Sequence, residues 1–380
     1  MSMTPSPRSL IAIDLGAVCS NVRYLKSKLQ RGTAFLAAVK ADGYGHGMVP
    51  CARAAVAAGA DGVAVATAEE AALLRERGFE QRILVMGPLY GADQYRELAG
   101  RSVDITILSD EMAQTVVELA AAGLQAHLHI KVDSGMNRQG LAPAEVGGFL
   151  QSLQDRPGLE VVGVMTHFAC ADEDAVSVEQ QMKRFLPCVH AVKIAWPRAL
   201  AHAANSAATM NYPQTHLDMV RCGIAVYGLS PRQGDARAEG LKPALAWTSR
   251  VVLVKRVQAG EGIGYGHTYR PEADTEVAVV PVGYADGVFR ALGNRAHVLI
   301  RGRRFPLVGR VSMDSFAVDL GTASGVRVGD EVVLIGESAG QRISAEEVAK
   351  WAGTINYEVT CRISLNRACR SFAEMTGDSG

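Results

Sequence analysis

The sequence predicts an α/β protein with an N-terminal (β/α)8 barrel of the TIM type, followed by a mainly β C-terminal domain. From residue 35 to about 226, short apolar or β-branched segments alternate with alanine-rich helical segments, whereas after residue 243 the helical pattern almost disappears. Strands that alternate with helices pair in parallel, and eight such units are typical of a closed barrel. We expect the barrel over 12–242 and the β domain over 243–380, with 8–14 as a candidate extra strand of the second domain.

Eight segments are predicted as barrel strands, because each is a short apolar run that ends at a loop. They are 35–39, 62–66, 82–86, 103–107, 127–132, 161–166, 199–203 and 217–220 or shortly after. Helical patterns between them include 48–58, 69–77, 110–122 and 178–194, and glycine follows the first three, as is common after a helix. The alternative is an open doubly wound sheet, which usually carries a Gly-x-Gly-x-x-Gly turn after its first strand. The sequence has none there.

The C-terminal part is rich in valine and isoleucine and reads as a series of β-strands separated by turns. The predicted strands are 247–257, 276–282, 296–301, 305–311, 316–320 and 331–335, and one helix is predicted at 345–351. We therefore interpret this part as a separate β domain.

Composition excludes several classes of protein. Lys+Arg and Asp+Glu both total 39, so the formal net charge is zero, which argues against a nucleic-acid partner. No segment approaches 18 uninterrupted apolar residues, so we expect no membrane span. The N-terminus lacks the apolar region of a secretory signal.

The seven cysteines are odd in number and form no Cys-x-x-Cys pair. We therefore expect reduced thiols and a cytoplasmic protein rather than a disulfide framework or a structural zinc site. His167, Cys170 and Asp172 lie close together in the sequence, but no second group of ligands completes a metal site.

Lys40 is the first candidate for chemistry, because it ends an apolar run and precedes a glycine-rich loop. A lysine at the mouth of a buried strand can lose its charge by desolvation and react with carbonyls. In a barrel of this kind functional groups gather at the carboxyl ends of the strands. The polar residues at those positions are Lys40, Lys131, His167, Asn205, Ser206 and Arg221. Ser206, Gly223 and Ile224 could hold a phosphate, so the rim suggests pyridoxal phosphate bound to lysine as a Schiff base.

The sequence resembles the fold-type III alanine racemases over nearly its whole length. The segments that carry the resemblance are AVKADGYGHG (38–47), KVDSGMNR (131–138), MTHFA (165–169), ANSA (204–207), VRCGIAVYG (220–228), GIGYGHT (262–268), PVGYADG (281–287), GRVSMD (309–314) and INYEV (355–359). The resemblance implies a pyridoxal-phosphate-dependent isomerase that interconverts L- and D-alanine and supplies D-alanine for the cell wall.

The resemblance also implies a role for each matching residue. Lys40 and Tyr265 look like the two proton-transfer bases on opposite faces of the substrate. Arg221 should face the pyridine nitrogen and connect through His167 to Tyr265. Because arginine keeps its proton, that nitrogen would stay largely unprotonated.

Further residues match the binding shell of the family. Tyr44, Asn205, Ser206, Gly223, Ile224 and Tyr357 look like cofactor-binding residues around the phosphate. Arg138 should contact the cofactor and the substrate carboxylate. Met313 and Asp314 look substrate-facing, and Tyr284 resembles an entrance residue. Lys131 matches a position that is often carbamylated in the family.

The resemblance implies a head-to-tail homodimer in which Tyr265 and Met313 reach the site of the neighbouring subunit. Two positions depart from the usual family pattern: Cys222 stands where proline is usual, and Asn137 where glycine is usual. Asparagine tolerates the left-handed backbone region, so we expect the turn at Asn137 to persist.

Three alternatives to alanine racemisation stay open at this point. A serine or broad-specificity racemase is the nearest of them. A basic amino-acid decarboxylase would carry an acidic residue in place of Arg221. A non-enzymatic carrier of pyridoxal phosphate would resemble the barrel alone, without the β domain and its GIGYG segment.

Overall fold

The structure, a computed structural model, describes residues 8–153, 156, 158–363 and 367–373. The chain divides into two compact units, Val18–Arg232 and a second unit that combines Met1–Ala17 with Gln233–Gly380. The barrel range expected from sequence, 12–242, is wider than the first unit at both ends. Ser9–Asp14 forms a strand of the second unit, and the residues from Gln233 onward also belong to that unit.

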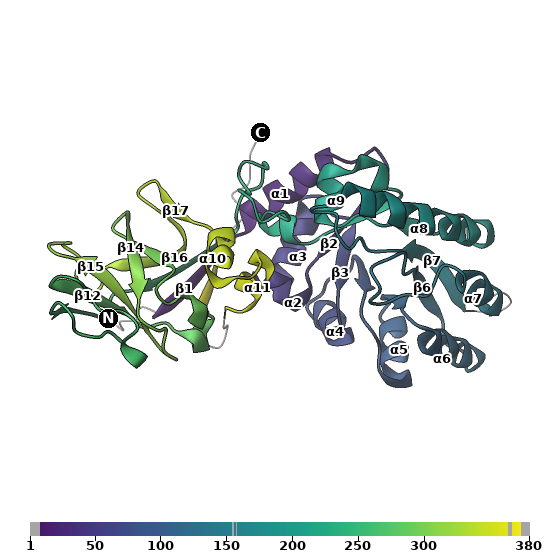
Figure 1. The fold of residues 1–380 in the computed structure, drawn as a ribbon. Coiled ribbons are helices and arrows are strands. Elements are labelled where there is room, and N and C mark those ends of the chain that lie inside the picture. The colour runs from purple at the N-terminus through teal and green to yellow at the C-terminus, as the bar shows by residue number, and fades with distance from the viewer. Residues whose placement is uncertain (1–7, 154–155, 157, 364–366, 374–380) are drawn as a thin grey trace. The chain divides into compact units, whose positions relative to one another are not determined.

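The unit Val18–Arg232 contains a closed barrel of parallel strands, which confirms the predicted fold class (Figure 1). The strands are β2 (Ala34–Ala38), β3 (Gly62–Val65), β4 (Arg82–Val85), β5 (Asp104–Ile107), β6 (Ala126–Lys131), β7 (Leu159–Met165), β8 (Leu200–His202) and β9 (Met219–Cys222). Pairing of β9 with β2 closes the barrel. Most strand residues are buried, which explains why these segments are mainly apolar in sequence.

Helices follow the strands and surround the barrel (Figure 1). They are α3 (Met48–Ala57), α4 (Ala68–Glu76), α5 (Gly91–Gly100), α6 (Asp110–Ala121), α7 (Val146–Leu153) and α8 (Ala175–Ala195), together with α1 (Leu15–Ser27) and the short α9 (Ser206–Asn211). Side-chain caps fix several starts: Thr67 forms a capping box with Glu70 on α4, and Ser109 and Asp174 cap α6 and α8.

The second unit is built on a largely antiparallel sheet, in the order β11-β12-β15-β14-β13-β16-β10-β1-β18, with β17 paired to β16. Its strands are β1 (Ser9–Asp14), β10 (Leu245–Arg250), β11 (Leu253–Val257), β12 (Thr275–Val280), β13 (His297–Ile300), β14 (Arg303–Val308), β15 (Phe316–Gly321), β16 (Glu331–Ser338), β17 (Gln341–Ile343) and β18 (Cys369–Ala373). Helices α10 (Ala345–Ala352) and α11 (Asn356–Cys361) complete it.

One predicted strand of this unit is wrong in its extent. The segment 247–257 was expected to be continuous, but it forms two strands with different partners: β10 pairs with β16 and β1, whereas β11 pairs with β12. The apolar run hides the break, because Val251 is buried while Val252 is exposed where the chain changes partners.

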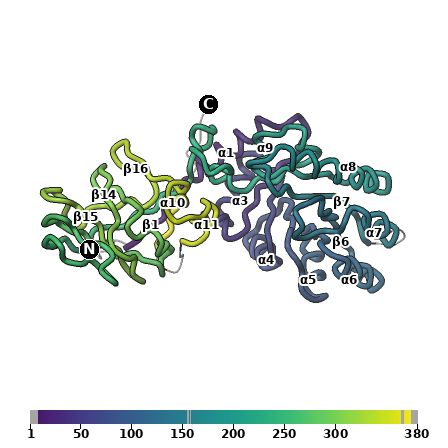
Figure 2. The backbone as a smooth tube through the Cα atoms, viewed as in Figure 1, coloured from purple at the N-terminus to yellow at the C-terminus, as the bar shows by residue number. Residues whose placement is uncertain are grey.

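The sheet combines segments from both ends of the sequence (Figure 2). β1 pairs antiparallel with β10 on one side and parallel with β18 on the other. The Trp247 indole N–H donates to the Ser9 hydroxyl over 2.7 Å, and the Ser249 hydroxyl donates to the Arg8 carbonyl over 2.6 Å. These contacts fix β1 in the second unit.

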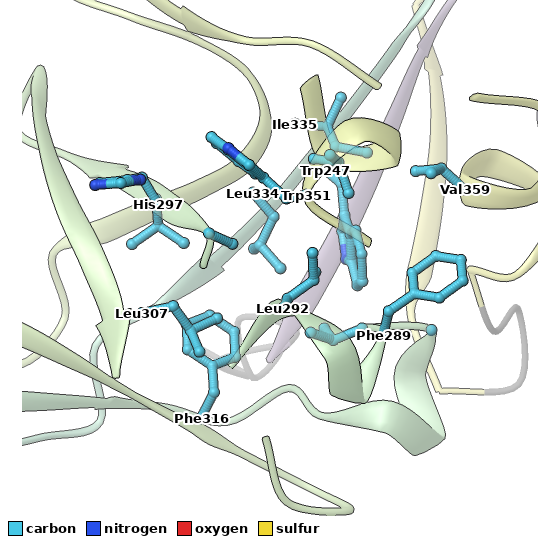
Figure 3. A pocket seen from close by; sticks show the side chains of 15 residues that line it. Trp247, Phe289, Leu292, His297, Leu307, Phe316, Leu334, Ile335, Trp351 and Val359 are labelled. Carbon is cyan, nitrogen blue, oxygen red and sulfur yellow. The ribbon is translucent and has the colours of Figure 1, made fainter. Parts of the chain in front are cut away.

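A small cavity lies in the core of the β unit, between the sheet and α10 (Figure 3). Its volume is about 20 Å³, room for about one water molecule, and its walls are mainly apolar, including Trp247, Phe289, Leu292 and Trp351. The residues that line it include none of the candidate site residues. We therefore interpret it as a packing void of the core.

Within the described residues, every helix is too short or too polar to cross a membrane.

Candidate active site

Lys40 follows β2 after one intervening residue, Val39, at the carboxyl end of the barrel, where an unusual backbone turn begins. Residues 41–45 all have positive φ, including Ala41 at 52°, Asp42 at 51° and Tyr44 at 54°. Left-handed backbone costs about 1–2 kcal/mol for each residue other than glycine, so the surrounding structure must hold this turn in place.

Two carboxylates stabilise the turn. The Ala41 amide donates to a Glu70 carboxylate oxygen over 2.7 Å, and the other Glu70 oxygen accepts from the Ala66 amide over 2.8 Å. The Asp42 carboxylate accepts from the amide of Met48, the first residue of α3, over 2.8 Å. The turn is therefore fixed to the starts of α3 and α4, so the Lys40 side chain extends from a rigid backbone.

A second loop organised by a carboxylate follows β6. The Asp133 side chain accepts from the amides of Gly135, Asn137 and Arg138 over 3.0, 2.9 and 3.1 Å. Asn137 has φ 55°, so asparagine does hold the left-handed position that was expected of it. The loop therefore fixes the backbone of Arg138, which follows Lys131, the last residue of β6, in the same connection.

Lys131 is almost completely buried among other cations. Burial, followed by the charges of Arg221, Arg138 and Lys40, lowers the pKa of Lys131 to about 7, although Asp133 opposes the shift. Four cationic side chains from different strands and loops therefore act on one another at the carboxyl end of the barrel. Such a cluster favours anions.

Arg221, on β9, is 4% exposed and is held on both terminal nitrogens. Nη1 donates to His202 Nδ1 over 2.8 Å, and Nη2 donates to the Thr166 and Ala203 carbonyls over 2.7 and 3.2 Å. Nη2 also lies 3.3 Å from Nδ1 of His167, the residue after Thr166. Burial lowers the pKa of Arg221 to about 10, so the guanidinium stays charged at neutral pH.

Because arginine only donates hydrogen bonds, His167 Nδ1 must accept, and a neutral His167 carries its proton on Nε2. Burial and then the charges of Arg221, Lys131, Lys40 and Arg138 hold the pKa of His167 well below its usual range. The predicted connection from Arg221 to His167 is present in the structure.

Five of the predicted cofactor-binding residues gather near the ends of β8 and β9: Asn205, Ser206, Gly223, Ile224 and Tyr44. Asn205 caps α9 by accepting from the Ala208 amide over 3.0 Å. The Ser206 hydroxyl accepts from the amides of Gly223 and Ala225 over 2.9 and 3.3 Å. Ile224 is buried.

Gly223 and Tyr44 come into unusually close contact. A Cβ atom on Gly223 would lie 2.4 Å from the Tyr44 hydroxyl, so only glycine fits there. Cys222, where proline is usual in the family, lies in β9 and donates its thiol hydrogen to Thr209 Oγ1 over 3.4 Å.

Four of the remaining candidates lie on connected loops of the β unit. The amide of Tyr284 donates to the Ser312 carbonyl over 3.0 Å, and the Ala285 amide donates to the Met313 carbonyl over 3.0 Å. Asp314 is paired with Arg367. The loop of Tyr265 lies against Arg310, because a Cβ on Gly266 would be 2.9 Å from its guanidinium. Tyr265, Tyr284 and Met313 are all exposed, with Tyr265 at 71%.

The structure brings two groups of predicted site residues together. Contacts or mutual electrostatic effects link Lys40, Lys131, Arg138, His167 and Arg221. Gly223 lies against both Tyr44 and Ser206. Tyr357 lies apart from the loops of Tyr265 and Tyr284 in sequence, on α11, and is partly buried. Within the described part of the chain, no group of three or more His, Cys, Asp and Glu side chains, the His167–Cys170–Asp172 segment included, is arranged to hold a metal ion.

Sequence reasoning missed three polar residues inside the barrel: Asp104, His129 and His202, which form a hydrogen-bonded line to Arg221. A signal was present, because each is a polar residue in or beside a strand predicted to be fully buried. Glu70, which supports the Lys40 turn, was also missed.

The chain matches the family description "Alanine racemase, N-terminal domain" over residues 13–231 and "Alanine racemase, C-terminal domain" over 244–371. The chain belongs to the alanine racemase family. As a member it is an enzyme of the isomerase class, and both parts of the chain carry the resemblance.

Similar proteins cover almost the whole chain. An alanine racemase of Symbiobacterium thermophilum is 46% identical over 355 residues, 93% of this chain and 94% of that protein. One from Desulfosudis oleivorans is 44% identical over 365 residues, 93% of each. Among solved structures, alanine racemase from Streptomyces lavendulae has a TM-score of 0.90 at 38% identity, covering 97% of this chain and 98% of that one. The Bacillus anthracis enzyme with bound L-Ala-P has a TM-score of 0.88 at 38% identity, covering 97% and 96%.

Proposed function

We propose that the chain interconverts L- and D-alanine and uses pyridoxal phosphate held at the carboxyl end of the barrel. The main support for the proposal is the cationic cluster of Lys40, Lys131, Arg138 and Arg221. The charges of the other three residues, which come from different strands and loops, lower the pKa of Lys131. It suits a cofactor and a substrate that are both anionic. The resemblance to alanine racemases supports alanine as the substrate.

The residues at the ends of β8 and β9 fit a phosphate group. The Ser206 hydroxyl accepts two backbone amides, so its own hydrogen can be donated to an anion. Gly223 lets the Tyr44 hydroxyl approach the backbone there, because a Cβ atom would lie 2.4 Å from that hydroxyl. We assign Tyr44, Asn205, Ser206, Gly223, Ile224 and Tyr357 to phosphate and cofactor binding, with Lys40 as the residue that bonds to the cofactor.

Arg221 is proposed to face the pyridine nitrogen. Its guanidinium keeps its proton at neutral pH, so it would donate a hydrogen bond without protonating that nitrogen. When bound, the cofactor supplies an electron sink for the negative charge left on the substrate Cα after proton removal. An arginine at this position limits the strength of that sink, which distinguishes racemisation from decarboxylation on the same fold.

Racemisation needs two bases on opposite faces of the substrate, and we assign these roles to the Lys40 amine and the Tyr265 phenol. A phenol is a weak base at neutral pH, so its anion needs stabilisation. His167 accepts from Arg221 on Nδ1, and its Nε2–H is the donor that would stabilise a phenolate. Arg138, Met313 and Asp314 are proposed to bind substrate, and Tyr284 to line the entrance.

We also propose a head-to-tail homodimer in which one copy supplies Tyr265 to the site of the other. Support comes from the exposure of Tyr265, Tyr284 and Met313, three large side chains on connected loops of the β unit. Exposed apolar side chains that gather in this way are typical of a surface that binds a partner.

A further proposal concerns Lys131. An amine with a pKa of about 7 is substantially neutral at physiological pH and can therefore react with carbon dioxide. A carbamate would replace a cation by an anion beside Arg138 and Arg221 and so remove the repulsion. A high-resolution density map that shows a plain amine on Lys131 would contradict this assignment.

The decisive experiment separates the two bases. Purified protein is first assayed for conversion of L- to D-alanine, with L-serine and other L-amino acids as the test of specificity. Lys40→Ala and Tyr265→Phe chains, each inactive alone, are then co-expressed with different tags and the heterodimer is isolated. One of its two sites has both residues intact, so about half of the wild-type activity per dimer should return. Heterodimers without activity would refute the shared site.

A further inference from the structure

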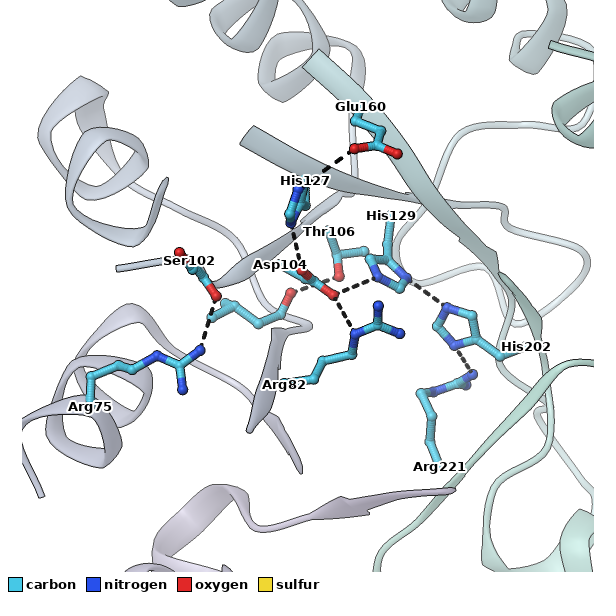
Figure 4. Close-up of polar contacts among 11 residues, drawn as sticks. Arg75, Arg82, Ser102, Asp104, Thr106, His127, His129, Glu160, His202 and Arg221 are labelled. Carbon is cyan, nitrogen blue, oxygen red and sulfur yellow. Dashed lines mark hydrogen bonds and ion pairs between the residues drawn. The ribbon is translucent and has the colours of Figure 1, made fainter. Parts of the chain in front are cut away.

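A line of buried polar side chains crosses the interior of the barrel and ends at Arg221 (Figure 4). Nη1 of Arg221 lies 2.8 Å from His202 Nδ1, and His202 Nε2 lies 2.8 Å from His129 Nδ1. His129 Nε2 lies 3.2 Å from a carboxylate oxygen of Asp104, at the start of β5. Both histidines are 0% exposed, and Asp104 is almost completely buried.

The barrel is built to admit this line. Gly163, on β7 between the strands of the two histidines, leaves space for His129: a Cβ atom there would lie 2.1 Å from His129 Nδ1. Any larger residue at 163 would displace the imidazole. The imidazole of His129 therefore occupies space that the neighbouring strand provides for it.

Only one arrangement of protons satisfies all three contacts. Arg221 can only donate, so His202 Nδ1 accepts and its proton lies on Nε2. His202 Nε2–H then donates to His129 Nδ1, whose proton lies on Nε2 and is donated to Asp104. The hydrogen bonds run in one direction, from the guanidinium to the carboxylate, and bonds aligned in this way strengthen one another.

Both imidazoles must be neutral in this arrangement, since a proton on His202 Nδ1 would face an N–H of Arg221. Burial and then the charge of Arg221 hold the pKa of His202 well below its usual range. Burial also lowers the pKa of His129, although Asp104 opposes the shift.

Other titratable groups surround the line. Arg82 Nε on β4 lies 3.2 Å from Asp104, and His127 Nδ1 on β6 lies 3.5 Å from it. Arg75 also interacts electrostatically with Asp104, and Lys131 and His167 lie near Arg221. Burial tends to raise the pKa of Asp104, but the hydrogen bond from His129 and the charge of Arg82 lower it overall. Asp104 is therefore an anion at neutral pH.

We propose that Asp104, His129 and His202 are positioning residues that fix the orientation of Arg221 and, through it, the donor presented to the cofactor's pyridine nitrogen. This inference rests on the proposed function of Arg221. The line holds Nη1 while the Thr166 and Ala203 carbonyls hold Nη2, so the guanidinium plane cannot rotate. Asp104 anchors the far end and provides a negative charge that partly balances the buried guanidinium.

The first test is independent of catalysis. Protein labelled with ¹⁵N-histidine, without cofactor, is studied by NMR between pH 6 and 9, and the signals of His129 and His202 are identified by their loss in His129→Gln and His202→Gln variants. Both residues should be neutral with the proton on Nε2 throughout. A proton on Nδ1 of either, or titration of either within this range, would overturn the proposal.

The second test uses the holoenzyme. Asp104→Asn keeps an acceptor oxygen but loses the charge, and we expect kcat to fall on the order of tenfold or more, with a KM for alanine within about threefold of wild type. Glu160→Gln is the matched control, because its exposed carboxylate lies 3.7 Å from His127 but outside the line, and kcat should not change.

A double-mutant cycle separates positioning from general damage to the barrel. In an Arg221→Lys background, Asp104→Asn should have little further effect, because the residue that the line positions is already absent. An equal loss in both backgrounds, or equal effects of Asp104→Asn and Glu160→Gln, would refute the positioning role. If wild-type enzyme does not racemise alanine, the proposed function fails, whereas the NMR result still decides the proton arrangement.

Discussion

The buried amine of Lys131 makes a prediction about stability that can be worked out from the structure. Its pKa is lowered from the ordinary 10.5 to about 7, so between these two pH values the unfolded chain carries a proton on this side chain that the folded chain does not. Stability therefore rises with pH across this window. The penalty of burying the amine is fully present below pH 7 and disappears above the ordinary pKa.

Each pH unit between the two pKa values is worth about 1.4 kcal/mol. Replacing the amine with an apolar chain of similar length, in Lys131→Met, should thus raise the free energy of unfolding of the cofactor-free protein by about 5 kcal/mol at pH 6 and about 3 kcal/mol at pH 8. Packing changes affect the gain in stability equally at both pH values. The sharper test is therefore that the gain is about one to two kcal/mol larger at pH 6 than at pH 8.

Urea unfolding, followed by circular dichroism in buffers without carbon dioxide, measures both values. Lys183→Met is the control, because Lys183 lies on the surface of α8 and its removal should change stability by less than about 0.5 kcal/mol. Added bicarbonate at pH 8 should stabilise wild type but not Lys131→Met if the carbamate forms. A gain that is the same at pH 6 and pH 8, or a loss at pH 6, would refute the reasoning.

Three further substitutions test other contacts. Gly223→Ala should displace the nearby tyrosine and weaken cofactor binding about tenfold or more in a spectroscopic titration, whereas Gly100→Ala, in a helix with open space, should bind normally. Glu70→Ala removes the acceptor for the Ala41 amide and should lower the free energy of unfolding in urea by about 1–3 kcal/mol. Unchanged stability would mean that the turn is stable without this hydrogen bond. Asp286→Asn removes the charge of a fully buried carboxylate that pairs with two arginines. It should lower the free energy of unfolding by about 3–5 kcal/mol, measured in the same way.

The barrel and the positions of Lys40 and Arg221 could be predicted from sequence for one reason. Strands that are buried on both faces are mainly apolar, so a polar residue at the end of such a segment marks the carboxyl end of the barrel. Lys131 and His167 were found in the same way, and the structure links both to Arg221.

Contacts that depend on register or backbone angle could not be predicted. His129 and His202 are separated by a whole strand, and their contact depends on how β6, β7 and β8 are staggered. The left-handed conformation of Ala41 could not be predicted, because alanine does not favour that backbone region. The division of 247–257 into β10 and β11 was not predicted for a related reason, since an apolar run does not show where a chain changes strand partners.

The place of β1 in the sheet limits how this chain can be divided. β1 separates β10 from β18, so a fragment that starts at residue 243 would lack it and leave two strand edges open to pair with other molecules. During synthesis the segment Ser9–Asp14 leaves the ribosome before its partners, because β10 and β18 emerge more than two hundred residues later. A fragment intended to isolate the C-terminal part should therefore carry Ser9–Asp14, fused or added as a separate peptide.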